Sequence, residues 1–300
     1  MSSKTRAKTL ESVAAELCVD ELTDYLVYSN LARIEPEPRR RRILEALAIQ
    51  EKRHYEFWRS LASRDCKPRK VNVTLLSIAY RLLGPAFILK LLERGEDEAI
   101  RRYRSVLEEA PEELKPEIER IIREEEEHEK ILMGEVKDSR VQYLGYAALG
   151  LADAIVEITG VHAGFLGATE NTIVAGVAGL IVGFAAAISM ASAAYIQAKH
   201  GEEESPVLSA LVTGLSYIVS VVLLALPYFL IHVMALSFAV STLIGIGLSG
   251  ALTYYASVVQ EKPFAREFLE TTGLILLTAV ASYAFGELVN RVFGIREVLG

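Results

Sequence analysis

Two long stretches without charged side chains constrain this chain more than any other feature of its sequence. Residues 205–260 contain no Asp, Glu, Lys or Arg, and residues 171–198 contain none either. A helix needs about 20 apolar residues to cross the hydrocarbon core of a bilayer, so the longer stretch has room for two spans. Apolar runs of this length have no soluble partner that would cover them. The second half of the chain is therefore predicted to lie in a membrane.

The hydropathy pattern predicts five membrane-spanning helices, with a tight turn near residues 227–234. Lys and Arg occur before the first span, after the second, and between the fourth and fifth, whereas the two opposite loops contain neither. The positive-inside bias therefore predicts a multi-pass protein of the cell membrane, with a cytoplasmic N-terminal half and an outside C-terminus. The expected spans are residues 142–163, 172–197, 206–228, 235–258 and 268–290.

The charge is divided unevenly between the two halves. Residues 1–140 carry 27 Lys and Arg against 28 Asp and Glu, whereas residues 141–300 carry 5 against 11. The first half is thus highly charged but nearly neutral, which gives no support to nucleic-acid binding. Its N-terminus has no apolar stretch of the kind that marks a signal peptide, so we expect this half to stay in the cytoplasm. Cys18 and Cys66 form no CxxC pair and are expected to be reduced thiols.

The first half is predicted to be all-helical, because no run alternates with a period of two. The breaks at Glu35–Pro38 and before Pro68 divide it, and Pro111 suits a helix start. Short connections and apolar stripes then favour a four-helix bundle, with helices near residues 10–32, 39–63, 73–109 and 111–136. The chain is thus expected to be all-α, with a bundle domain at 1–138 and a transmembrane domain at 139–300.

One apolar segment, residues 73–92, has two interpretations. It contains Arg81, Gly84, Pro85 and Lys90 within an otherwise apolar run. We interpret it as the first half of the third helix, buried against the bundle, a dimer partner or the bilayer surface. A sixth membrane span is the alternative, but it would place the two halves of the site described next on opposite sides of the membrane.

Two histidines of the first half follow a glutamate at the same spacing. Glu51 and His54 form one Glu-x-x-His pair, and Glu125 and His128 form the other. Residues three apart share a helix face, so each pair can present one carboxylate and one imidazole to the interior. A carboxylate-bridged di-iron centre needs two such pairs and one Glu from each of the two remaining helices.

The other two helices each offer a glutamate in a matching position. Glu21 and Glu96 are each followed seven residues later by a tyrosine, Tyr28 and Tyr103. The two halves of the bundle therefore repeat the order Glu, Tyr, Glu-x-x-His at nearly equal distances. Solvent-exposed residues seldom form such a repeat by chance, so the sequence predicts a buried metal site.

Only some of the glutamates around His128 are then expected to bind metal. An acidic run on a helix is usually a solvated face. Glu124 and Glu127 are expected to face solvent or to pair with Arg123 and Lys130, and the role of Glu126 is left open.

The segments "DELTDYLVYSNLA", "EKRHYEFW", "GEDEAIRRY" and "EEEHEK" resemble the rubrerythrin branch of the ferritin-like family. The resemblance implies two bound irons, for which manganese is an alternative since carboxylate and imidazole ligands suit both metals. Asp97 or Glu98 could add to or replace the helix-three ligand. Rubrerythrin has a second iron site made of two CxxC pairs, which this chain lacks, so a peroxidase fed through that site is disfavoured. The ligands implied by the resemblance are Glu21, Glu51, His54, Glu96, Glu125 and His128.

The first predicted span contains two acids, Asp153 and Glu157, four residues apart on one helix face. An acid inside a membrane is costly and indicates an ion or proton path. A misplaced span end that leaves both acids at the interface is the alternative. In the second span, Met190 lies among small residues, where a methionine by itself is usually a packing residue.

The stretches "LGLADAIVEITGVHAGFLGAT" and "AGVAGLIVGFAAAISMASAAYI" resemble the vacuolar iron transporter family. That resemblance implies a homodimer of five-span subunits that moves Fe(II) or Mn(II) against protons, with Asp153 and Met190 lining the path. Glu157 is added on its position alone. The family has Gly-Glu where this chain has Ala193-Ala194, and its glutamate-rich insert between spans two and three is missing, with only Glu202–Glu204 in its place.

Together the two resemblances imply a membrane-bound ferritin-like protein fused to an iron transporter. The expected function is transport of Fe(II), with the soluble bundle collecting or oxidising the metal. A membrane-anchored di-iron oxidase or peroxidase is the alternative, as is a manganese transporter with a metal sensor. The sequence leaves open the metal preference, the direction of transport, the proton stoichiometry and whether oxidation is obligatory.

Overall fold

The computed structural model describes residues 10–62, 65–93, 96–135, 139–201 and 205–299, without the side chains of residues 93, 96–98, 129–135, 139–142 and 299. In this part of the chain every regular element is a helix. The chain divides into two compact units, residues 1–138 and 139–300, and each is described by itself.

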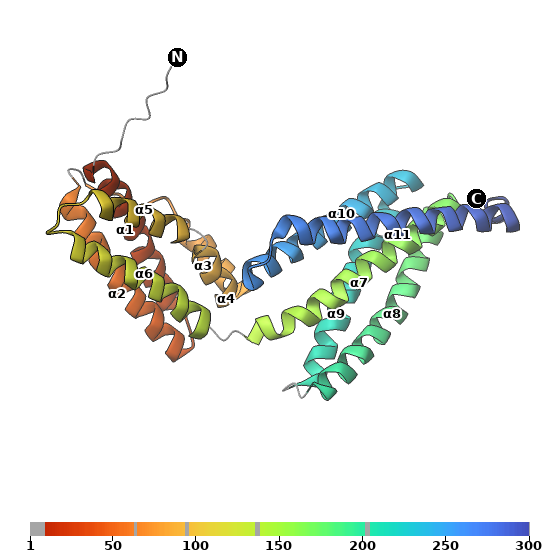
Figure 1. Ribbon diagram of the computed structural model, residues 1–300. Helices are drawn as coiled ribbons and strands as arrows, with labels where there is room; N and C mark the ends of the chain where they lie inside the picture. Colours follow the sequence, from red (N-terminus) through yellow and green to blue (C-terminus); the bar gives the residue numbers. More distant parts are fainter. Residues whose placement is uncertain (1–9, 63–64, 94–95, 136–138, 202–204, 300) are drawn as a thin grey trace, which may run out of the picture. The chain divides into compact units, whose positions relative to one another are not determined.

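The first unit contains six helices (Figure 1): α1 (Leu10–Ile34), α2 (Pro38–Leu61), α3 (Val73–Leu83), α4 (Pro85–Glu93), α5 (Glu96–Glu109) and α6 (Lys115–Glu135). Local chemistry sets several of their ends. The Glu37 carboxylate accepts hydrogen bonds from the backbone N–H groups of Arg39 and Arg40, and Pro38 occupies the first turn of α2. The "EPEP" break thus works as a helix start with a side-chain cap.

The expectation of one continuous third helix at 73–109 is wrong. Gly84 has a φ of 94°, a value that side-chain-bearing residues rarely adopt, and it separates α3 from α4 before Pro85. The fourth helix begins at Lys115 rather than at Pro111, because residues 112–114 form a turn. With 11 and 9 residues, α3 and α4 are too short to cross a bilayer, which argues against a sixth span.

Four of these helices share one apolar core. Leu17 of α1, Trp58 of α2, Val106 of α5 and Ile121 of α6 belong to the same buried cluster. The Trp58 ring stacks on that of Tyr103 at an interplanar angle of 8°. The core occupies the N-terminal half of α1 and of α6, and the charged residues discussed below lie directly beside it.

The expectation of reduced thiols is also wrong, since Cys18 and Cys66 form a disulfide with a Cα–Cα distance of 6.0 Å. The chain after α2 returns along α1, which brings Cys66 to Cys18 although no sequence motif links them. Further along the same return segment, the backbone N–H of Arg69 donates to Thr23 Oγ1 at 2.9 Å. The disulfide therefore ties the α2–α3 connection to α1.

The second unit contains α7 (Ser139–Ala168), α8 (Thr172–His200), α9 (Pro206–Leu230), α10 (Met234–Gln260), α11 (Phe264–Phe293) and the short α12 (Ile295–Leu299). Within the described residues, five helices are long and apolar enough to cross a membrane, as predicted from hydropathy. Large apolar side chains such as Leu243, Val280 and Phe285 are exposed on them. These features identify a multi-pass membrane protein.

Helix α7 is the central element of this unit, because it packs against α8, α9, α10 and α11. Small residues allow the closest contacts. A Cβ added at Gly286 of α11 would collide with the backbone carbonyl of Gly164, and one at Gly150 would collide with that of Thr213. Such small-residue contacts between apolar helices are typical of membrane proteins. They hold the helix that carries Asp153 and Glu157.

Candidate metal centre

A buried group of carboxylates and imidazoles joins three helices of the first unit. Ligand atoms of Glu21, Glu51, His54 and Glu125 lie within 4.8 Å of one another, and all four side chains are buried. Glu21 comes from α1, Glu51 and His54 from α2, and Glu125 from α6. This buried group can hold a metal ion, and His128 lies directly beside it.

The Nδ1 atoms of both histidines point toward these carboxylates. Nδ1 of His54 is 2.9 Å from Glu125 Oε1 and 3.5 Å from Glu21 Oε2. Nδ1 of His128 is 3.2 Å from Glu51 Oε1 and 3.4 Å from Glu125 Oε2. The two rings lie with their centroids 6.0 Å apart, inclined by 23°. Each imidazole therefore presents the same nitrogen to a shared set of oxygens.

The outward nitrogens are held by polar side chains that are not part of that set. Nε2 of His54 is 2.7 Å from Glu124 Oε2, and Nε2 of His128 is 3.0 Å from Gln50 Oε1. A hydrogen bond to the second ring nitrogen is the usual way in which a protein orients a metal-binding histidine. The expectation that Glu124 faces solvent is therefore wrong, because its carboxylate bonds the buried ring of His54. Glu127 is exposed as predicted.

The buried atoms without a hydrogen-bond partner support metal binding. They include Nδ1 of His54, Nδ1 of His128 and Oε1 of Glu125. These are atoms that face the centre of the group, whereas the outward Nε2 atoms are satisfied. A buried polar atom without a partner is costly, and here the cost falls on atoms suited to a metal ion. The donor set fits a hard or borderline divalent metal such as iron or manganese.

Burial and mutual charge set the protonation of the metal-free group. Burial raises the pKa of Glu21 well above its usual value, and the charges of Glu125 and Glu51 act in the same direction. Burial would also raise the pKa of Glu51, but the imidazoles of His128 and His54 beside it outweigh this effect and lower that pKa to about 2. Without metal, Glu21 therefore tends to keep its proton, which a bound cation has to displace.

A tyrosine connects the carboxylates to the apolar core. Tyr103 of α5 donates its hydroxyl to Glu21 Oε1, and its ring stacks on Trp58. Burial and the Glu21 charge hold the pKa of this phenol well above its usual value. The tyrosine seven residues after Glu96 therefore bonds the glutamate of α1, a link across helices that the repeat in the sequence did not specify.

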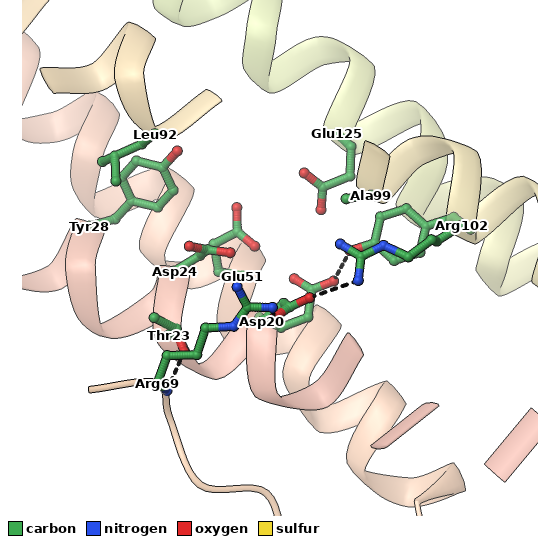
Figure 2. Close-up of a pocket in the computed structure, with 12 residues that line it drawn as sticks. Asp20, Thr23, Asp24, Tyr28, Glu51, Arg69, Leu92, Ala99, Arg102 and Glu125 are labelled. Carbon is green, nitrogen blue, oxygen red and sulfur yellow. Dashed lines mark hydrogen bonds and ion pairs between the residues drawn. The ribbon is translucent and has the colours of Figure 1, made fainter. Parts of the chain in front are cut away.

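A cavity of about 210 Å³ lies against this group, and both acidic and basic side chains line it. Figure 2 shows Arg69 and Arg102 on either side of Asp20. Arg69 Nη2 lies 2.5 Å from Asp20 Oδ1, and Arg102 Nη1 lies 3.2 Å from Asp20 Oδ2. Asp24 also lines the cavity (Figure 2). Burial, with the charges of Glu51 and Glu125, raises its pKa to about 8.

Asp20 and Asp24 are not among the site residues predicted from the sequence, although the spacing of Asp24 from Glu21 could have indicated a role for Asp24. Asp24 lies three residues after Glu21 and can therefore share its helix face. The helix-three candidate, Glu96, is the first residue of α5, but its side chain lies outside the described residues, as do those of Asp97 and Glu98.

One candidate path residue of the second unit, Glu157, is bonded by a tyrosine. Tyr217 of α9 donates its hydroxyl to Glu157 Oε2. Tyr217 belongs to a buried cluster with Ile155 and Ile158, and Met190 of α8 packs against that cluster. Asp153 lies one turn before Glu157 on α7 and is exposed, whereas Glu157 is half-buried. Both acids belong to the apolar stretch Tyr143–Ala168 of α7.

A further polar residue of this unit was missed. His162 is fully buried, neither of its ring nitrogens has a hydrogen-bond partner, and its ring lies 4.0 Å from that of Tyr228. A Cβ at Gly179 would collide with its Nε2, so the glycine makes room for the imidazole.

Comparison of the chain with known proteins found no matching family model, no similar curated protein and no similar solved structure.

Proposed function

We propose that the protein transports Fe(II) across a membrane, and that its first unit is a ferritin-like di-iron domain that collects the ion. The observation that carries the proposal is the pair of inward, unpartnered Nδ1 atoms of His54 and His128 beside three buried carboxylates. A multi-pass unit with two acids inside one span is the second element. Mn(II) satisfies the same ligands and is the competing cargo.

The proposed site is completed by residues with distinct roles. Glu21, Glu51, His54, Glu125 and His128 would hold the metal, with Glu96 as the sixth ligand from α5. A di-iron centre supplies redox chemistry when it is bound. Glu124 and Gln50 keep both imidazoles oriented, and Tyr103 restrains Glu21. Asp20 and Asp24 line the cavity beside these ligands.

In the membrane unit, the proposed path follows α7 and α8. Asp153 and Glu157 would bind the cation inside the span, with Met190 as a soft ligand, and protons would move in the opposite direction. Tyr217 holds the Glu157 carboxylate in place. The proposed assembly is a homodimer with a cytoplasmic first unit and an outside C-terminus.

Iron flux into proteoliposomes tests the proposal. The full-length protein should carry Fe(II) into vesicles that contain a fluorescent chelator, and Asp153→Ala should abolish the flux. Glu51→Ala should reduce metal bound to the purified protein and slow transport at low Fe(II). Flux equal to that of empty vesicles, together with oxygen consumption on addition of Fe(II), would instead identify a membrane-anchored oxidase. Competition by Mn(II) ranks the two cargoes.

A further inference from the structure

Helix α3 is fixed to the first unit by one face only. Tyr80 is buried and donates its hydroxyl to the buried carboxylate of Glu35, which follows the end of α1. Ser77 accepts a hydrogen bond from Asn30 Nδ2 at 3.0 Å. The inner face of α3 is therefore packed against the C-terminal end of α1. The helix is short, and the side chain of Asn72 caps its first turn.

The opposite face of α3 is an exposed apolar stripe. Leu75, Ile78 and Leu82 are exposed to 63%, 49% and 74%, and their spacing of three and four puts them on one side of the helix. Val71, just before the start of α3, is a further exposed apolar side chain and is counted with the stripe. In the next helix, α4, the apolar residues Phe87, Ile88 and Leu89 are buried. The stripe is thus a feature of α3 and not of the whole segment.

The charges around the stripe all have one sign. Residues 66–92 include five basic side chains and no acidic one. An apolar helix face with only Lys and Arg beside it in the sequence is the pattern of a helix that lies in the interface of an anionic bilayer, although one of these residues, Arg69, pairs with Asp20. A second copy of the chain fits less well, because a symmetric contact would bring the same cations together. The basic residues are Lys67, Arg69, Lys70, Arg81 and Lys90.

The position of α3 within the first unit agrees with a bilayer as its partner. Leu17 shares a core cluster with Ile121, and four residues later Glu21 shares the metal group with Glu125. Helices α1 and α6 therefore run parallel, and α3 lies at the end of the unit where α6 ends (Figure 1). In the chain, α6 is the last helix before α7, the first helix of the membrane unit.

We propose that α3 is an interfacial membrane helix, whose stripe Val71, Leu75, Ile78 and Leu82 inserts into the headgroup region of an anionic bilayer. It would hold the metal-binding unit at the membrane surface by a contact that does not depend on the connection between the units. The inference requires only that the chain is a membrane protein, and it stands whether or not the cargo is iron.

Tryptophan quenching by brominated lipids tests the proposal on the full-length protein. The chain has one native tryptophan, Trp58, which is fully buried. Ile78→Trp places a reporter on the stripe. Ile49→Trp, on α2, is the matched control, because Ile49 is exposed to 63%. Both variants are reconstituted into nanodiscs of phosphatidylcholine and phosphatidylglycerol, with and without brominated acyl chains.

Brominated lipid should quench the Ile78→Trp reporter about twofold and leave the Ile49→Trp reporter unchanged. Leu75→Glu combined with Leu82→Glu should remove the quenching, and omission of phosphatidylglycerol should weaken it. No quenching at residue 78, or equal quenching at residues 78 and 49, overturns the proposal. Absence of quenching with excimer formation between pyrene labels at residue 78 would assign the stripe to a second copy, which also overturns it.

Discussion

Nε2 of His54 lies 2.7 Å from Oε2 of Glu124, the first residue of an acidic run on another helix. The contact leaves Nδ1 of the same ring directed at Glu125 and Glu21. One acid of the run thus orients the imidazole and its neighbour lines the metal group. Because the two glutamates are adjacent in sequence, substitutions in the run can separate orientation from coordination.

Glu124→Ala should weaken metal binding about 10- to 100-fold without removing a ligand, because His54 loses the bond that fixes its ring. The measurement is competition against a fluorescent metal indicator. Glu127→Ala is the control, since Glu127 is exposed on the same helix, and it should bind metal as the wild type does. Equal affinities of the Glu124→Ala and wild-type proteins would show that the contact has no orienting role.

The metal-free protein should lose stability as the pH rises from about 7 to about 10. Burial would lower the pKa of His128, but Glu125 and Glu51 beside its Nδ1 raise it to about 10. Because the pKa of His128 is higher in the folded protein than in the unfolded chain, where it is near 6.5, protonation of this imidazole stabilises the fold fully at pH values below about 6.5. The stabilisation is lost as the pH rises to the pKa of the folded protein. Near-ultraviolet circular dichroism of the Trp58 environment during denaturant titration measures the effect. His128→Gln should flatten the pH dependence.

Asp24→Asn should stabilise the metal-free protein, and the gain should grow from pH 4 to pH 8. Burial and neighbouring carboxylates raise the pKa of Asp24 to about 8, so folding is penalised at every pH above its unfolded value near 3.9. The penalty is complete above pH 8. Thermal melts with excess chelator test this. A gain that is the same at pH 4 and pH 9 would mean that the charge is not the cause.

Reduction of the Cys18–Cys66 disulfide should destabilise the first unit by about 4 kcal/mol, the loop-entropy estimate for the sequence separation of 48. Cys66→Ser should have the same effect as a reductant, and a reductant should not affect the variant further. Denaturant titrations with and without phosphine reductant provide the values. An unchanged midpoint after complete reduction would show that the hydrogen bonds of the return segment hold it unaided.

Gly286→Ala should destabilise the membrane unit, because the added methyl group collides with the carbonyl of Gly164 where α7 meets α11. A cost of about 1–3 kcal/mol is typical of such overpacking. Gly273→Ala, also on α11, is the control, since nothing lies within 4 Å of its added Cβ. Thermal aggregation in detergent compares the two. Equal stability would show that the helices separate at little cost.

In the first unit, features set by local spacing could be predicted from the sequence, whereas contacts between different elements could not. The two Glu-x-x-His pairs could be recognised because residues three apart share a helix face wherever the helix is placed. The contacts of Glu124 with His54, of Tyr103 with Glu21 and of Cys18 with Cys66 join different elements. Local spacing does not encode such contacts, so Glu124 was assigned to solvent and the cysteines to thiols.

By itself the sequence determined that the chain is helical and that five of its helices can cross a membrane, because helix periodicity and span length are local properties read directly from the residues. The tertiary structure alone shows which acids of the run 124–127 turn inward and that Asp24 lines the cavity. Each of these depends on packing between helices far apart in the chain, since burial and partner choice are set by the fold and not by the neighbouring residues.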